Sequence, residues 1–236
     1  MNRFSMQSMK EKTARRERRE RILPLDRMAA FVDGVFAIGA TLLALEVTVP
    51  VVRDAATGTD LAVALLKQWP SYAAFSVTFF LVGAYWINHH RMFNLLRGAN
   101  HTFLVLNNLF LMAIAITPFP NALVAAYLLQ PTLRGVASAV YGIASLALAV
   151  MFNAVWWYAY RRRLFRPGCP PAAIRKVLTS YLVGPAFYAA AIALSFVAPW
   201  IALAMYVLIA LGYWGEGPVA AVPEGYPIAE EFGAGG

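Results

Sequence analysis

The stretch from Arg27 to Pro50, RMAAFVDGVFAIGATLLALEVTVP, most constrains what this chain can fold into. It is long and apolar enough to cross a bilayer, because a spanning helix needs about 20 mostly apolar residues. At 100° per residue, one side of such a helix carries an apolar stripe, with Thr41 at its edge: Arg27, Phe31, Gly34, Ile38, Leu42, Leu45 and Val49. The other side carries small residues around one carboxylate: Ala29, Asp33, Ala37, Ala40 and Ala44. Small residues let helices approach closely in lipid. We therefore expect the small strip to pack on a neighbour and the apolar stripe to meet something else, such as its own copies around an axis.

Composition and charge distribution indicate a polytopic membrane protein. Hydrophobic residues make up 60% of the 236 residues and charged residues only 14%, against about 45–50% and 25% in soluble domains. The net charge of +8 is unevenly placed, since 17 of the 20 Lys and Arg residues fall on one expected side of the membrane. That division is the positive-inside bias. It reports orientation and argues against nucleic-acid binding.

The hydropathy pattern predicts an all-α fold with six transmembrane helices and no soluble domain. We expect a basic cytoplasmic arm over residues 1–24, a six-helix domain over 25–214 and a disordered cytoplasmic tail over 215–236. Both termini then lie in the cytoplasm of a multi-pass cell-membrane protein. The expected spans after the first are 61 or 69 to 86, 101–129, 134–160, 177–197 and 200–214.

Prolines mark the expected interruptions of these helices. Pro70 can separate an interfacial turn from the second span, and Pro118 and Pro120 should kink or end the third, because each proline removes a backbone donor. Pro167 to Pro171 indicate a cytoplasmic loop before the fifth span.

Asp33 is the ionisable side chain expected well inside a span. A carboxylate within the membrane is costly, so it is a candidate functional group with a partner nearby. Candidate partners on the same membrane side are Arg27, Arg91 and one of the histidines His89 and His90. The alternative is a structural interfacial ion pair that fixes the depth of the helix.

The adjacent histidines His89 and His90 allow three interpretations. A metal site is weakly supported, because no Cys, Asp or Glu lies nearby in sequence. A pH-sensitive hydrogen bond near the cytoplasmic mouth is a second possibility. Polar capping of a helix end is as well supported as both together. The sequence therefore predicts no metal ion, cofactor or catalytic constellation.

Three blocks of sequence carry a resemblance to a known family. They are Arg27-x-x-x-Phe31-Val32-Asp33-Gly34 with Ala37-Ile38 and Thr41-Leu42-Leu43, then 85–93 (YWINHHRMF), then 106–111 (LNNLFL) leading into Pro118-Phe119-Pro120. In this order, over roughly residues 25–125, they resemble the transmembrane protein 175 family of potassium channels. The family signature R-x-x-x-F-S-D has Ser where this chain has Val32. A hydrogen bond assigned to that Ser cannot be carried over.

The resemblance implies a role for each face of the first helix. Periodicity alone would favour lipid or core contact for the apolar stripe, but in this family the first helix lines the pore. The resemblance implies a hydrophobic constriction at Ile38. Leu42 and Leu45 continue the same face of the helix, and the nearby Thr41 hydroxyl can replace part of an ion's water shell. It also implies that the signature residues Arg27, Phe31 and Asp33 lie near Trp86 and one of the two histidines. A T-V-G-Y-G filter is absent from the sequence.

The predicted function is a potassium-permeable channel in the lipid bilayer. One first helix cannot enclose a pore, so several chains must contribute one each, and the resemblance implies a homotetramer. The competing interpretation is a membrane-embedded transporter or enzyme that uses Asp33, His89 and His90. Transporters more usually have helices broken by Gly or Pro at mid-membrane in paired halves, whereas these prolines lie near the outer ends. The preference among potassium, sodium and protons, and the gating stimulus, stay open.

Overall fold

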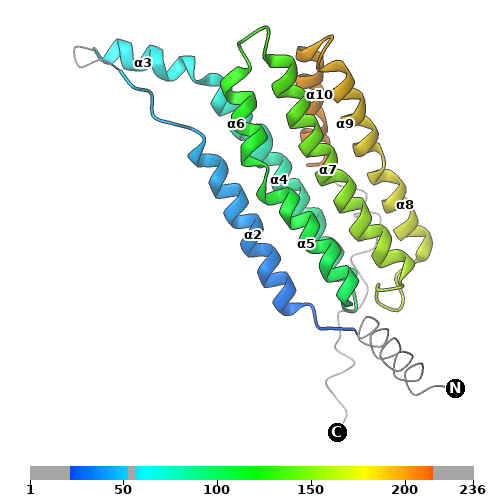
Figure 1. Cartoon of the computed structure of the whole chain (residues 1–236). Coiled ribbons are helices and arrows are strands. Elements are labelled where there is room, and N and C mark those ends of the chain that lie inside the picture. The colour runs from blue at the N-terminus through cyan, green and yellow to red at the C-terminus, as the bar shows by residue number, and fades with distance from the viewer. Residues whose placement is uncertain (1–21, 53–56, 215–236) are drawn as a thin grey trace, which may run out of the picture.

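A computed structural model describes residues 22–52 and 57–214, and the regular secondary structure of this part of the chain consists of helices joined by short loops. The predicted cytoplasmic arm (1–24), except for its last three residues, and the predicted tail (215–236) lie outside the described residues. The helices are α2 (Asp26–Leu45), α3 (Gly58–Lys67), α4 (Trp69–Leu95), α5 (His101–Ala115), α6 (Pro118–Tyr127), α7 (Arg134–Arg161), α8 (Pro171–Tyr181), α9 (Val183–Leu194) and α10 (Pro199–Gly212). Figure 1 shows the long helices side by side in a bundle, with α2 at one edge and α3 extending sideways from one end.

Five helical segments are long and apolar enough to cross a membrane. They are Asp26–Leu45, Trp69–Leu95, His101–Tyr127, Arg134–Arg161 and Pro171–Leu194. The sixth apolar helix, Pro199–Gly212, is shorter. The all-helical prediction is therefore confirmed for the described residues, together with five of the predicted membrane segments.

The first helix ends earlier than its apolar sequence predicts. Helix α2 stops at Leu45, and residues 48–52 follow without regular structure, although the apolar sequence continues to Pro50. Val47, Thr48 and Val49 are β-branched and lose side-chain freedom in a helix. Pro50 further disfavours helical backbone at the residue before it.

The second segment extends farther than Trp86, where the sequence suggested a membrane–water interface. Helix α4 begins at Trp69, with Pro70 in its first turn, and continues to Leu95. Its last turns bury His89, Met92 and Phe93 against the bundle. The polar residues there lie within a packed helix, which continues two and a half turns beyond the predicted end of the span at Trp86.

Prolines also set the remaining boundaries. The third segment breaks at Ile116 and Thr117 before α6 begins at Pro118, which confirms the predicted interruption. The fifth segment begins at Pro171 and not at residue 177. Proline is favoured in the first turn of a helix, where its missing N–H costs nothing, so Pro171 starts a helix that was expected to be a loop.

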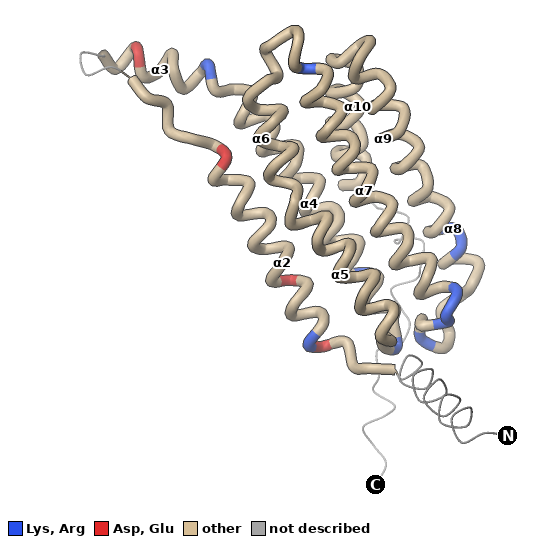
Figure 2. Tube along the Cα trace, in the orientation of Figure 1, with Lys and Arg blue, Asp and Glu red and all other residues tan. Residues whose placement is uncertain are grey.

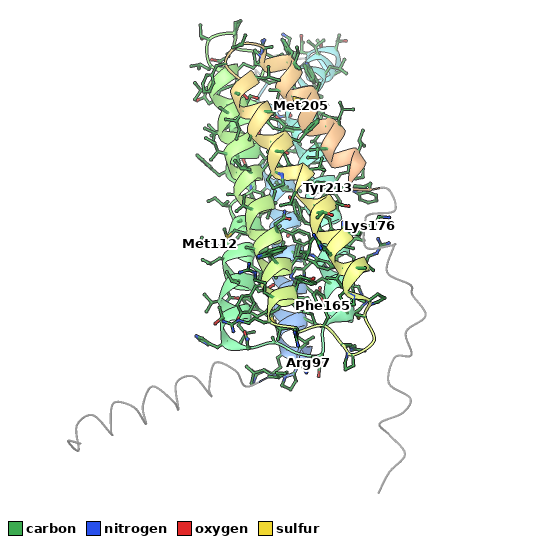
Figure 3. All side chains as sticks on the ribbon, turned by 90° about the vertical axis from the view of Figure 1, so that its right-hand side faces the viewer. Arg97, Met112, Phe165, Lys176, Met205 and Tyr213 are labelled. Atoms are coloured by element: carbon green, nitrogen blue, oxygen red, sulfur yellow. The ribbon has the colours of Figure 1, made fainter. Side chains whose placement is uncertain are left out.

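The two ends of the bundle differ in charge. Figure 3 shows Arg97 and Phe165 toward one end and Met205 toward the other; we name them the Arg27 end and the α3 end. Figure 2 shows most of the blue Lys and Arg positions toward the Arg27 end of the bundle. The Lys and Arg residues of α2, of the later part of α4 and its following loop, and of the chain from the end of α7 into α8 are Arg27, Arg91, Arg97, Arg161, Arg162, Arg163, Arg166, Arg175 and Lys176. Among the described residues, the α3 end carries only Lys67 and Arg134.

Backbone contacts join the segments at the Arg27 end. Leu23 pairs with Ala99 through two hydrogen bonds, from Leu23 N to Ala99 O (2.7 Å) and from Ala99 N to Leu23 O (3.0 Å). Gly98 makes this approach possible, because a Cβ there would lie 2.9 Å from the Leu23 carbonyl oxygen. The chain entering α2 is thereby fixed to the loop between α4 and α5.

Candidate pore helix and its partners

Helix α2 packs on the bundle through its bulky residues and not mainly through its small ones. The buried face contains Met28, Val32, Phe36, Gly39 and Leu43. In the predicted small strip, Asp33, Ala37 and Ala44 are exposed. The strip lies beside the packed face, because larger apolar side chains gain more from burial than alanine does.

Two positions on the buried face, Val32 and Gly39, show how α2 packs on the bundle. Val32 is only 2% exposed, so the residue that departs from the family signature is an apolar part of the core. A Cβ at Gly39 would lie 3.2 Å from Ile114 Cγ2. The absence of a side chain at Gly39 therefore sets how near α2 approaches α5.

The apolar stripe of α2 is left exposed by the described residues of the single chain. Exposed fractions are 57% for Phe31, 61% for Ile38, 41% for Leu42 and 73% for Leu45. At 1.5 Å per residue, the stripe from Phe31 to Leu45 extends roughly 21 Å along the helix. Of the five long segments, α2 also has the smallest buried share. A continuous apolar face of this length requires a covering surface or lipid.

The Thr41 hydroxyl is held against its own helix. Its Oγ1 donates to the carbonyl oxygens of Ala37 (3.0 Å) and Ile38 (2.9 Å). A hydroxyl has one proton and two lone pairs. Because the proton is used by the backbone, the oxygen lone pairs of Thr41 remain available to accept a hydrogen bond or contact a cation.

Asp33 has a hydrogen-bond partner on α4. The indole Nε1 of Trp86 donates to Asp33 Oδ1 at 2.9 Å. This contact brings the first two sequence blocks together, as the resemblance implied. The candidate partners Arg27, Arg91, His89 and His90 form no ion pair or hydrogen bond with Asp33 within the described part of the chain. Asp33 and Trp86 instead border an apolar groove of about 430 Å³ between α2 and α4, with Ala37, Ala40, Phe79 and Gly83 on its walls.

The two histidines occupy different environments. His89 is buried, and its Nε2 lies 2.8 Å from Asn107 Oδ1 on α5. Its ring stacks on Phe110 with centroids 5.3 Å apart, and lies 6.0 Å from the ring of Phe36 on α2. His90 is exposed, with its ring 5.7 Å from that of Trp86. His89 therefore belongs to the α2–α4–α5 contact, and His90 lies beside the Asp33 partner.

Sequence reasoning did not single out Asn107 and Phe36 as site residues. Asn107 was visible in the third block, but its sequence could not show that it faces His89. The buried Asn107 Nδ2 has no hydrogen-bond partner in the described structure. The same part of the chain contains no group of three or more His, Cys, Asp or Glu residues able to hold a metal ion.

Comparisons with known proteins agree with this arrangement. Residues 27–118 match the family model described as "Endosomal/lysosomal potassium channel TMEM175". The chain is 40% identical over 186 residues to "Potassium channel Cha6605_3372" of Chamaesiphon minutus, covering 78% of this chain and 91% of that protein. It is also 40% identical over 188 residues to "Potassium channel B446_29190" of Streptomyces collinus, covering 79% of this chain and 90% of that protein.

A solved structure extends the likeness to the fold. The crystal structure of a lysosomal potassium-selective channel TMEM175 homolog from Chamaesiphon minutus superposes with a TM-score of 0.71 at 38% identity. The likeness covers 80% of this chain and 95% of that chain. Sequence and fold thus agree over most of the helical bundle, and the chain belongs to the TMEM175 family.

Proposed function

We propose that this protein is a potassium-permeable channel whose pore is lined by α2 from several copies of the chain. The observation that carries the proposal is the unpartnered apolar stripe of α2, which contains Ile38, Leu42 and Leu45. The two relatives and the solved structure are named as potassium channels. This chain aligns with 90% or more of the length of each of them. That likeness supports potassium as the permeant ion here.

The exposed stripe is the part of the proposed pore that one chain contributes. A single α2 cannot enclose a pore, and closed rotational symmetry is the usual form of a homo-oligomer. We propose a homotetramer with the stripe of each copy facing a common axis. Asp33 lies about 140° from Ile38 around the helix, so it faces away from that axis. Arg27, Phe31, Asp33, Trp86 and His89 then serve assembly or gating, with His90 beside Trp86.

The proposed orientation rests on the charge difference between the two ends. We propose six membrane-spanning segments in the cell membrane, with α10 as the sixth and the Arg27 end in the cytoplasm. The gathering of Lys and Arg toward that end supports this orientation. The predicted cytoplasmic arm and tail, at the two termini, would then lie on the same side.

The constriction is proposed to act by partial dehydration. Aliphatic side chains that meet at an axis offer no polar group to replace the water around an ion, and such constrictions gate by dewetting. Potassium holds its water less tightly than sodium does, so its barrier at Ile38 should be lower. The Thr41 oxygen, one turn along the same face, can replace part of the lost water shell.

The competing transporter or enzyme interpretation finds less support in the geometry. Asp33 accepts from Trp86, whereas His89 pairs with Asn107, so these groups have separate partners and do not converge on one substrate. The two groups also differ in environment, because Asp33 is exposed and His89 is buried.

Liposomes containing the purified protein test the proposal. Paired potassium and sodium gradients should give passive, uncoupled current with a reversal potential close to the potassium equilibrium potential. A chain with Ile38→Asn tests whether that current passes α2. Flux that requires a second, co-transported solute would overturn the channel, and a reversal potential that follows sodium or protons would overturn the ion assignment.

A further inference from the structure

An apolar slot lies at the α3 end of the bundle. It is on the opposite side of α4 from the groove that Asp33 and Trp86 border. It has a volume of about 290 Å³ between α4, α6, α7 and α10. Its walls include Trp69, Val77, Leu128, Trp200 and Leu203. Trp69 and Trp200 are roughly half exposed, so the slot opens to the surface of the bundle. We name it the α10 slot.

The polar groups beneath the slot are already hydrogen-bonded to protein. Tyr141 Oη lies 3.1 Å from Thr78 Oγ1, which in turn donates to Asn121 Oδ1. Tyr206 Oη donates to the Ser138 carbonyl oxygen at 3.1 Å. The tyrosines therefore present only their rings, and the α10 slot suits an apolar chain better than a polar ligand.

One cation lies at the rim of this apolar slot. The guanidinium carbon of Arg134 lies 4.2 Å from the centroid of the Trp200 ring, and its Nε donates to the Leu128 carbonyl oxygen. Trp200 and Leu128 both line the slot, so two of its walls hold the arginine in place. Arginine has five N–H donors. The other four N–H groups of Arg134 have no acceptor among the described residues. No described carboxylate forms an ion pair with Arg134.

We propose that the α10 slot binds an anionic phospholipid, with an acyl chain in the slot and the headgroup phosphate on Arg134. Arginine pairs with phosphate through parallel, charge-assisted hydrogen bonds. Arg and Trp at a helix end lie at the depth of lipid headgroups, with the hydrocarbon beside the helix below them. A soluble anion would leave the slot unused, and a neutral apolar molecule would leave the arginine unpaired. With the orientation proposed above, the lipid would lie in the outer leaflet, but the site itself does not depend on that orientation.

A binding titration with fluorescent phosphatidylglycerol on the purified full chain in neutral detergent tests this site. Arg134→Gln should weaken binding about tenfold by removing the charge-assisted bonds, while Arg134→Lys should retain part of it. Ala204→Trp places a bulky side chain at an exposed position of the slot and should weaken binding to a similar extent. Phosphatidylcholine and diacylglycerol should bind more weakly than phosphatidylglycerol.

Arg161→Gln is the matched control. Arg161 is on the other end of the same helix and also lies over a tryptophan, 5.4 Å from the Trp157 ring centroid, but neither Arg161 nor Trp157 lines the α10 slot. Its replacement should leave binding unchanged. The proposal is overturned by wild-type affinity in Arg134→Gln or Ala204→Trp, by an equal loss in Arg161→Gln, by equal affinity for diacylglycerol, or by no binding to the wild type. If Arg134→Gln does not fold, Arg134→Lys and Ala204→Trp decide the outcome. None of these measurements depends on ion conduction.

Discussion

The indole N–H of Trp86 on α4 donates to Asp33 Oδ1 on α2 at 2.9 Å. This bond joins the helix with the exposed stripe to the rest of the bundle. It lies on a different side of α2 from Ile38, so it can change how α2 is held without touching an ion on the Ile38 side.

Trp86→Phe removes the donor and keeps an aromatic ring. We expect a loss of about 1 kcal/mol in stability, typical of one hydrogen bond, together with a lower open probability or tetramer yield. The ratio of potassium to sodium permeability should stay unchanged. Asp33→Asn, which retains an oxygen acceptor but not the charge, should act in the same direction.

Thermal unfolding, size-exclusion profiles and bilayer recordings provide the measurements for this pair. Trp157→Phe is the control, because Trp157 is also about half exposed but has no hydrogen bond to a described residue through its indole. A sharp change of ion selectivity in Asp33→Asn, with normal opening, would place Asp33 in the pore and contradict the assignment.

The adjacent histidines should respond differently to the same substitution. His89→Leu leaves the buried Asn107 Oδ1 without its partner, at a cost on the order of 1–3 kcal/mol. His90→Leu changes an exposed residue and should cost less than about 0.5 kcal/mol. Thermal unfolding in one detergent compares the two variants.

A double variant isolates the hydrogen bond from the packing. Replacing both partners of a buried pair by apolar groups is often nearly neutral. His89→Leu combined with Asn107→Leu should therefore unfold at a higher temperature than His89→Leu alone. If the double variant is no more stable than the single one, the cost comes from lost ring stacking on Phe110 and not from the unpaired amide.

Sequence reasoning succeeded where a local pattern decides the structure and failed where tertiary contacts do. The break before Pro118 follows from proline chemistry, and the match of the fourth segment to Arg134–Arg161 follows from hydropathy. The end of α4 at Leu95 could not be predicted in this way. In the sequence, polar residues such as His89 indicate a membrane–water interface, and only the structure shows that Asn107 is a buried partner of His89.

The candidate site shows the same division. The family resemblance implied that Trp86 lies near Asp33, and the two side chains are hydrogen-bonded. Which face of α2 packs could not be read from the small residues, because Phe36 and Leu43 fill spaces that α4 and α5 create. Likewise, the choice between His89 and His90 depends on the rotation of α4, which hydropathy does not fix.

Cys169 gives a test of topology, because it is the chain's one cysteine. It lies in the loop between α7 and α8, and Phe165 of the same loop is toward the Arg27 end in Figure 3. A membrane-impermeant thiol reagent should label it from the cytoplasmic face only. Labelling of Cys169 in intact cells from outside would contradict the proposed orientation.

The pH dependence of that labelling follows from the environment of the thiol. Partial burial raises the pKa of Cys169 above its usual value, and the neighbouring Arg166 opposes the rise. A raised pKa means less thiolate at neutral pH, so alkylation should be slower than for a free thiol, by about twofold or more, and should increase as the pH rises through the folded pKa. Arg166→Gln removes the opposing charge and should slow the reaction further.

The last prediction is that Ile38 forms the tightest ring of the pore. Ile38→Asn places an amide where four aliphatic side chains are proposed to meet, so water should enter, conductance should rise and discrimination between potassium and sodium should weaken. Leu42→Asn and Leu45→Asn should have smaller effects on the same face, and Thr41→Val should shift selectivity by removing the hydroxyl oxygen.

Ile143→Asn is the matched control, because Ile143 is 56% exposed on α7 against 61% for Ile38 on α2. Single-channel recordings under paired potassium and sodium gradients measure both quantities. Lipid exposure alone would make the two isoleucines equivalent, whereas a pore formed by α2 makes only Ile38 sensitive. If Ile143→Asn changes conduction and Ile38→Asn does not, the conduction path is not along α2.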